Sequence, residues 1–137
     1  MKRNIATFAL FAATLIALAT HASAQEQPFQ ANVPFNFTVG NRQLPLGFYR
    51  IRTLSIRQVQ IENMQHDISA LTLANSAIRS RDDDKKLVFD KIGGQYFLRG
   101  IVSASSAFEL PKSESERQAQ ILLKQAIDAE NKTYTAQ

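Results

Sequence analysis

Hydrophobic and polar residues alternate along the part of the chain that follows residue 28. From residue 29 to residue 39 the odd positions are Phe, Ala or Val, and the even positions are mostly polar. This period of two predicts a strand with one face in a core and the other in water. Pro34 stands on the polar side and has no backbone N–H to donate, so we expect the strand to lie at a sheet edge or to bend there.

Further segments with the same period follow. Residues 48–52 place Tyr49 and Ile51 on one side and arginines on the other, and residues 55–62 contain a second alternating run whose phase slips by one position. The slip indicates a β-bulge or a late start of the strand. Residues 68–78 also fit a strand, but their Ala and Leu content leaves a helix open.

A pair of glycines, Gly93-Gly94, separates two alternating segments at residues 87–92 and 95–102. Two glycines in this position predict a β-hairpin with a two-residue turn. Asp90 and Arg99 lie diagonally across it, and an exposed ion pair between them would contribute well under about 1 kcal/mol. The expected pairs are Ile92 with Gln95, Phe89 with Leu98, and Leu87 with Gly100. The expected core face is Leu87, Phe89, Tyr96 and Leu98, and the opposite face is Val88, Asp90, Phe97 and Arg99.

The C-terminal part has a helical period instead. Ser113 and Glu116 have the spacing of a capping box, in which the two side chains bond backbone N–H groups at the start of a helix. The apolar residues that follow predict an amphipathic helix over residues 114–130, with a frayed tail at 131–137. We expect the apolar stripe to pack on the β domain, and docking on a second copy is the alternative. The stripe consists of Ala119, Leu122, Leu123, Ala126 and Ile127.

These elements together predict a mainly β fold. Six to seven short strands within residues 25–112 would form a small antiparallel barrel or sandwich. The amphipathic helix at 113–130 would close it as part of the same domain. The sequence does not decide between barrel and sandwich.

The first 24 residues have the three-part layout of a secretory signal peptide. Lys2 and Arg3 are followed by an uncharged apolar run at 5–20 and by small residues that suit cleavage after Ala24. The run is shorter than the roughly 20 residues of a spanning helix, so we expect cleavage rather than retention as a membrane anchor. The sequence thus predicts an exported protein, periplasmic or extracellular, with no transmembrane segment after cleavage.

The composition excludes several classes of chemistry. The chain has 137 residues and no cysteine, which rules out disulfides, a cysteine nucleophile and a lipid-modified cysteine. Without Lys2 and Arg3, 14 basic and 12 acidic residues remain, a balance that argues against nucleic acid as a partner. His66 is the one histidine after residue 24, so a zinc enzyme is not expected.

The densest group of carboxylates is Asp82, Asp83 and Asp84. Basic residues flank the group on both sides, and no calcium-loop pattern follows it. We therefore expect a solvated, charge-balanced loop at 79–86, with a weak calcium site as the alternative. No metal and no cofactor is predicted.

Two groups of residues are candidates for binding. Aromatic and aliphatic residues at strand spacing either fill the core or line a cavity for one small apolar ligand. These candidates are Phe35, Phe37, Tyr49, Phe89 and Leu98. Three arginines form either a solvated strand face or a basic patch for lipid head groups or acidic polysaccharide. These are Arg50, Arg52 and Arg57.

Three pieces of the chain carry a resemblance. They are residues 29–40 (FQANVPFNFTVG), residues 44–49 (LPLGFY) and Tyr96-Phe97-Leu98. Their order resembles that of a group of short exported bacterial proteins with an AxVPFxFxVG and LPxGxY pattern behind a signal peptide. The resemblance covers nearly the whole chain after residue 24 and implies export. It implies no activity and no functional residues, because none is assigned to that group.

The resulting prediction is a non-enzymatic binding or assembly module of the cell envelope or extracellular space. Its partners would be a second copy or components of the envelope. One alternative is a carrier of a small apolar ligand in a β-barrel cavity. The other is a metal-independent enzyme that uses Tyr, Arg and carboxylate groups.

Overall fold

A computed structural model describes residues 28–77 and 84–135, with side chains in the C-terminal helix described as far as Lys132. The signal peptide predicted for residues 1–24 lies outside the described residues. So do Asp82 and Asp83 of the predicted charged loop and the end of the predicted tail.

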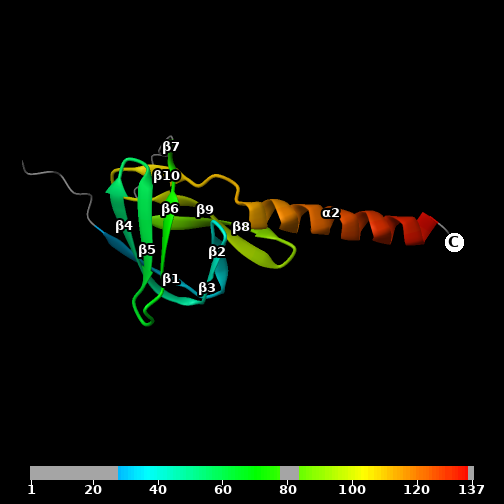
Figure 1. The fold of residues 1–137 in the computed structure, drawn as a ribbon, viewed down its shortest axis with the longest axis horizontal. Coiled ribbons are helices and arrows are strands. Elements are labelled where there is room, and N and C mark those ends of the chain that lie inside the picture. The colour runs from blue at the N-terminus through cyan, green and yellow to red at the C-terminus, as the bar shows by residue number, and fades with distance from the viewer. Residues whose placement is uncertain (1–27, 78–83, 136–137) are drawn as a thin grey trace, which may run out of the picture.

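The described residues form two β-sheets and one long helix (Figure 1), which confirms the mainly β fold with a C-terminal helix. Sheet A has the strand order β1-β4-β5-β6, and sheet B has the order β3-β2-β9-β10-β7, with β8 paired to β9. The pairs are antiparallel except for β2 with β9, which is parallel. The strands of sheet A are β1 (Phe29–Val33), β4 (Gly47–Ser55), β5 (Gln58–Asn63) and β6 (Ser69–Leu73). The strands of sheet B are β2 (Phe37–Val39), β3 (Arg42–Leu44), β7 (Asn75–Ala77), β8 (Lys86–Ile92), β9 (Gln95–Val102) and β10 (Ala107–Glu109).

The strand predicted for residues 29–39 is two strands in different sheets. β1 pairs with β4 at the edge of sheet A, and β2 pairs with β3 and β9 in sheet B. The break falls at Pro34, where a missing N–H costs no ladder bond. The apolar residues on both sides of this corner face the core. The alternation of apolar and polar residues therefore continues from 29 to 39 although the strand does not.

A second corner divides the segment at residues 68–78. It contains β6 of sheet A and β7 of sheet B, separated by the buried Ala74. The segment is therefore β rather than helical. The phase slip in residues 55–62 has a similarly simple cause, since a turn at Ile56 and Arg57 delays β5 until Gln58.

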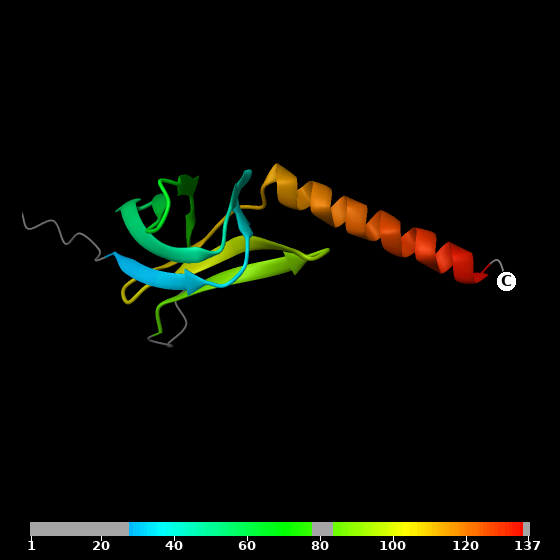
Figure 2. The ribbon, with the colours of Figure 1, turned by 90° about the horizontal axis from the view of Figure 1, so that it is seen from below.

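The described residues form ten strands, where six to seven are predicted from the sequence. Two predicted strands are each divided at a corner, and β3 and β10 have three residues each, too few to show a period. In Figure 2, β1 and β4 form a layer above the β8–β9 hairpin, and the core lies between these layers. Its largest fully buried side chains include Tyr49, Phe37 and Ile61.

The β8–β9 hairpin turns at Gly93 and Gly94, which both have positive φ. Ile92 pairs with Gln95 and Phe89 with Leu98, as predicted. The predicted pair of Leu87 with Gly100 is wrong, because an irregularity after Val88 shifts the register and Leu87 pairs with Ile101. Phe97, which was expected on the outer face, has an exposed fraction of 2%.

The helix α2 (Glu114–Thr135) projects away from both sheets in Figure 1. Its start lies against β8, and side chains from Gln120 to Lys132 are exposed. The structure therefore differs from the expected packing of the stripe on the β domain, which is limited to the first turns. No helix of the described residues combines the length and hydrophobicity needed to cross a membrane.

Candidate functional site

The five residues considered as the lining of a ligand cavity pack against one another. Phe37 lies edge-on to Tyr49 and to Phe89, at ring-centre distances of 5.1 Å and 5.3 Å. Phe35 meets Phe89 edge-on at 5.1 Å. Phe37, Tyr49 and Leu98 are each exposed by 3% or less. Because rings in this geometry occupy the space that a ligand would need, the structure places Phe37, Tyr49 and Leu98 in the core and packs the partly buried Phe35 and Phe89 against it.

Tyr49 is held at the start of β4 by a polar corner. Its hydroxyl donates a hydrogen bond to the carbonyl oxygen of Pro45. Burial raises the pKa of Tyr49, and the smaller effect of a hydrogen bond with the Asn63 side chain lowers it. Gly47 permits this corner because its φ is 152°, and a Cβ there would lie 3.0 Å from Oε1 of Gln65.

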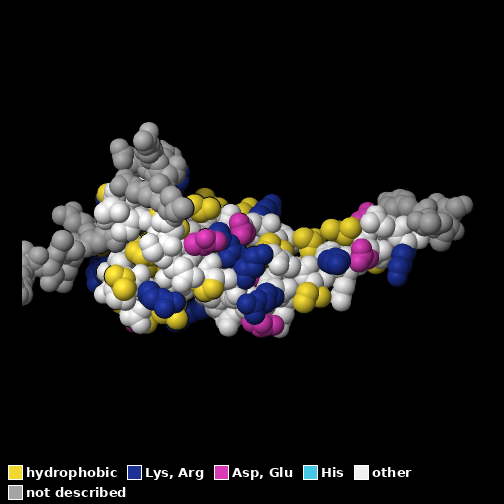
Figure 3. Space-filling model, turned by 90° about the horizontal axis from the view of Figure 1, so that it is seen from above, with side chains coloured by type: hydrophobic (Ala, Val, Ile, Leu, Met, Phe, Trp, Pro, Cys, Tyr) yellow, Lys and Arg dark blue, Asp and Glu magenta, His cyan; other side chains and the backbone are white. Residues whose placement is uncertain are grey.

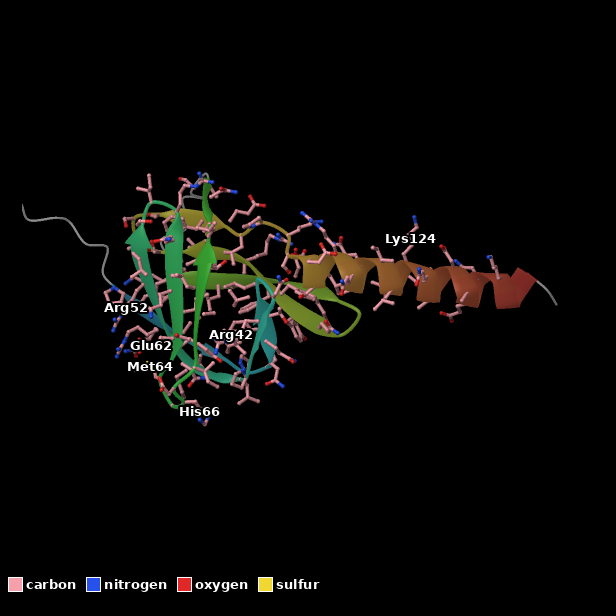
Figure 4. The ribbon with its side chains drawn as sticks, in the orientation of Figure 1. Arg42, Arg52, Glu62, Met64, His66 and Lys124 are labelled. Atoms are coloured by element: carbon pink, nitrogen blue, oxygen red, sulfur yellow. The ribbon has the colours of Figure 1, made fainter. Side chains whose placement is uncertain are left out.

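The three arginines of the predicted basic patch are not all together. Arg50 and Arg52 point outward from β4 toward the same carboxylate, with Nη atoms 3.8 Å and 3.6 Å from Oε2 of Glu62. Figure 4 shows Arg52 and Glu62 on the outer side of sheet A. Arg57 lies at the β4–β5 turn, where Nη2 is 3.4 Å from Oδ1 of Asn75. The Glu62 carboxylate thus faces the guanidinium groups of Arg50 and Arg52, and Arg57 lies apart from them at the turn.

A polar groove of about 440 Å³ lies between the β2–β3 turn, the tip of the β8–β9 hairpin and the start of α2. Its lining contains four side-chain amides and no carboxylate, imidazole or lysine, so it offers hydrogen bonds and no acid–base pair. The polar residues of the lining are Asn36, Thr38, Asn41, Gln43, Gln95, Tyr96 and Ser115.

The start of α2 is attached to the β domain by a partly buried cluster of charges. Ser113 caps the helix as predicted, because its hydroxyl accepts a hydrogen bond from the N–H of Glu116 at 3.2 Å. The Glu116 carboxylate does not reach back to the cap and instead accepts from the guanidinium of Arg99. Arg99 also donates to Asp90 at 2.8 Å and to the carbonyl oxygen of Leu110 at 2.8 Å. The predicted Asp90–Arg99 pair is present, but it belongs to this cluster.

The charges in this cluster are paired internally. The side chains of Arg99 and Glu116 are exposed by 15% and 3%. Burial lowers the pKa of Arg99, but the hydrogen bond to Asp90 and the charges of Glu116, Asp90 and Glu109 outweigh it and raise that pKa. We therefore interpret the cluster as an attachment for α2. The sequence carried a signal for it, because Glu116 stands on the same helical face as the apolar stripe.

The stripe itself is exposed beyond this attachment. Glu116, Ala119 and Leu123 follow at spacings of three and four, so the face that docks on the β domain continues outward as the apolar stripe. Figure 3 shows hydrophobic side chains in a row along the projecting helix. The exposed fractions of Leu122, Leu123 and Ile127 are 65%, 39% and 49%. This surface is the strongest candidate for a functional site.

His66 lies in the β5–β6 loop and is exposed (Figure 4). Its backbone N–H donates to Oδ1 of Asn63 at 3.0 Å, a contact that belongs to the loop. Comparison with protein-family models, curated proteins and solved structures gives no match. The resemblance stated above therefore stays a prediction.

Proposed function

We propose that this protein is an exported, non-enzymatic assembly module, and that it pairs with a second copy of itself through the exposed face of α2. Export is supported by the signal peptide predicted for residues 1–24. The observation that carries the pairing is the exposed apolar stripe, which is continuous with the docked face of the same helix.

The length and direction of α2 favour a second copy as the occupant. Residues 120–132 extend past the attachment by about 20 Å, at 1.5 Å per residue. A second copy offers an apolar stripe of the same length. Such an interface is isologous, so each stripe covers the other and both apolar faces are removed from water.

The two helices would run antiparallel. The docked face at Glu116 and the stripe lie on the same side of α2, so the β domain already occupies the space where a parallel neighbour would begin. An antiparallel neighbour places its β domain beyond the far end instead. With the stripes centred on one another at residue 123, Ala119 packs against Ile127 of the second copy, a small side chain against a large one as in knobs-into-holes packing.

An enzyme and an apolar-ligand carrier are less well supported. The carboxylates of Asp90 and Glu116 both pair with Arg99 beneath the start of α2, and the candidate cavity residues contact one another in and against the core. Neither arrangement leaves a group free to act on a substrate or a space for a ligand.

Self-association can be tested with variants of the same helix. We expect the wild-type chain to sediment as a dimer with a dissociation constant on the order of micromolar, since the stripe is small for a stable interface. Leu122→Ser combined with Ile127→Ser should shift the dissociation constant by at least about tenfold, because large apolar side chains leave the interface. Analytical ultracentrifugation over a range of concentrations measures both.

Ile121→Ser is the matched control for this experiment. Ile121 is 57% exposed but lies off the stripe, so its loss should leave the dimer unchanged. Circular dichroism checks that all variants keep α2. A monomer at all concentrations, or equal weakening by Ile121→Ser, would contradict the proposal.

The direction of pairing can be tested because the chain has no cysteine of its own. In the antiparallel arrangement residue 119 faces residue 127 of the second copy. Mixed Ala119→Cys and Ile127→Cys proteins should therefore form a mixed disulfide on oxidation, and neither variant should crosslink efficiently to itself. Self-crosslinking of Ala119→Cys would indicate parallel pairing.

A further inference from the structure

One end of sheet A carries a second exposed apolar surface, unrelated to α2. Leu54 and Ile56 stand at the end of β4 and in the β4–β5 turn, with exposed fractions of 53% and 84%. Leu71 and Leu73 on β6 are exposed by 63% and 59%. We call these four residues the turn-end patch.

The patch lies on the outer face of the sheet. In the β5–β6 ladder Gln60 pairs with Leu71 and Gln58 with Leu73, whereas the intervening Val59 is fully buried. Since side chains alternate between the two faces of a strand, Leu71 and Leu73 point away from the core. At the end of sheet A that carries the β4–β5 turn, aliphatic side chains therefore project into solvent and form a convex surface rather than a cleft.

Two guanidinium groups lie beside the patch. Arg52 pairs with Gln60 across the β4–β5 ladder, and Gln60 pairs with Leu71, so Arg52 lies in the same row as this patch residue. The Arg52 side chain is 43% exposed. Arg57 is exposed within the turn. The four strands of sheet A contain one acidic residue, Glu62. Figure 3 looks onto this end of the β domain and shows hydrophobic and basic side chains close together there.

The turn is held in shape by local hydrogen bonds. The N–H of Arg57 donates to Oγ of Ser55 at 3.4 Å, and the carbonyl oxygen of Arg57 accepts from the N–H of Ala74 at 3.0 Å. The Arg57 side chain reaches Asn75 across the corner between β6 and β7. The projecting aliphatic groups are thus presented by a backbone that is fixed on both sides.

Projecting aliphatic groups beside arginines match the chemistry of an anionic lipid surface. Aliphatic side chains gain free energy on entering the boundary between head groups and acyl chains, and guanidinium groups bind the phosphates beside them. Each Arg near a negatively charged leaflet adds a further attraction that falls off within a Debye length. A protein groove would also cover aliphatic groups, but it would not by itself require arginines around them.

We propose that the turn-end patch binds the surface of an anionic phospholipid bilayer, with Leu54, Ile56 and Leu73 entering the interface and Arg52 and Arg57 contacting phosphates. This proposal does not rest on the pairing of α2, because it uses a different surface. It names a class of envelope component, anionic phospholipid, to which the module would attach.

The test is co-sedimentation of the exported chain with vesicles of equal parts phosphatidylglycerol and phosphatidylcholine. Leu54→Ser combined with Ile56→Ser should weaken binding by about tenfold or more, since several methylene groups leave the interface. Arg52→Gln combined with Arg57→Gln should weaken it by several-fold and reduce its dependence on salt. Vesicles of phosphatidylcholine alone should bind weakly.

Leu46→Ser is the matched control, because Leu46 is 57% exposed but lies before β4, at its opposite end from Leu54. It should change binding by less than about twofold. All variants carry the same N-terminus, verified by intact mass, so any contribution of residues 1–27 is common to them. Thermal unfolding confirms that each variant is folded.

Three results would overturn the proposal: no binding to anionic vesicles, equal binding to neutral vesicles, or equal loss on Leu46→Ser. If the turn-end variants bind vesicles normally but lose a specific protein partner, the patch is a protein interface instead. A wild-type chain that stays monomeric at all concentrations but binds vesicles normally would contradict the proposed function and leave this inference intact.

Discussion

At the residue scale, Tyr49 combines a fully buried ring with a hydroxyl that must stay protonated. The ring packs edge-on to Phe37, and the hydroxyl donates to Pro45. An ionised phenolate could not make that donation, and burial would leave its charge poorly solvated. The raised pKa of Tyr49 therefore has a consequence for stability in alkali.

We expect this group to stabilise the folded state below about pH 10, where Tyr is protonated in both states. Above that pH the unfolded chain releases the proton and the folded state retains it, so stability is lost as the pH rises toward the raised pKa. Tyr49→Phe should remove this loss, at a cost of about 1 kcal/mol near neutral pH for the missing hydrogen bond. Urea unfolding at a series of alkaline pH values measures both effects.

Tyr96→Phe provides the comparison, because Tyr96 is only partly buried. It should retain the wild-type dependence on pH. If Tyr49→Phe and the wild-type chain lose stability in parallel above pH 10, Tyr49 is not the responsible group.

At the element scale, α2 depends on a few polar contacts at one end. Arg99→Met removes the guanidinium and leaves the Glu116 carboxylate buried without its partner. Breaking a buried pair in this way should lower the free energy of unfolding by about 3–5 kcal/mol, measured by urea denaturation.

Arg117→Met is the control for that substitution. Arg117 pairs with Glu114 at 3.7 Å, but both side chains are 63% exposed. An exposed pair of this kind should contribute less than about 1 kcal/mol. Similar losses for Arg99→Met and Arg117→Met would show that the partly buried cluster does not attach the helix.

The same scale shows what the sequence pattern predicts and where it stops. A period of two marks which residues of 29–39 face the core, and Pro34 marks a bend. Neither signal predicts that the chain passes from one sheet to the other at this point. An apolar residue that faces the core gives the same sequence pattern in either sheet. The same limit applies to the helix. An apolar stripe predicts that one face of the helix is buried, but it does not identify the surface that covers this face.

The candidate site residues can also be predicted only in part. The alternating pattern identifies the aromatic residues that face inward, but it does not show which of these rings contact one another. Arg57 separates from Arg50 and Arg52 because a turn, which the alternation did not locate, intervenes. Arg99 and Glu116 are 17 residues apart, too far for local spacing to pair them.

At the scale of the whole molecule, the projecting helix makes stability depend on concentration. If the folded chain dimerises and the unfolded chain does not, association stabilises the folded state by mass action. We expect the melting temperature to rise by several degrees over a hundredfold increase in concentration, and to rise less for the Leu122→Ser, Ile127→Ser variant over the same range. Scanning calorimetry at several concentrations measures this, and a constant wild-type value would argue against the dimer.

The parallel pairing of β2 with β9 bears on the order in which the protein folds. The strands of sheet A that pair in sequence, β4 to β6, need only short turns between them. β2 pairs with a strand about sixty residues later in the chain, and such distant contacts form slowly. The β2–β3 hairpin can therefore join β9 only when residues 95–102 are available, and the contact of α2 with Arg99 needs the same strand. A chain that is made from its N-terminus can complete sheet A and the β2–β3 pair early, but β2 keeps one edge without its neighbour β9 until the last third of the sequence is available, which makes that edge the place where pairing with another chain would begin.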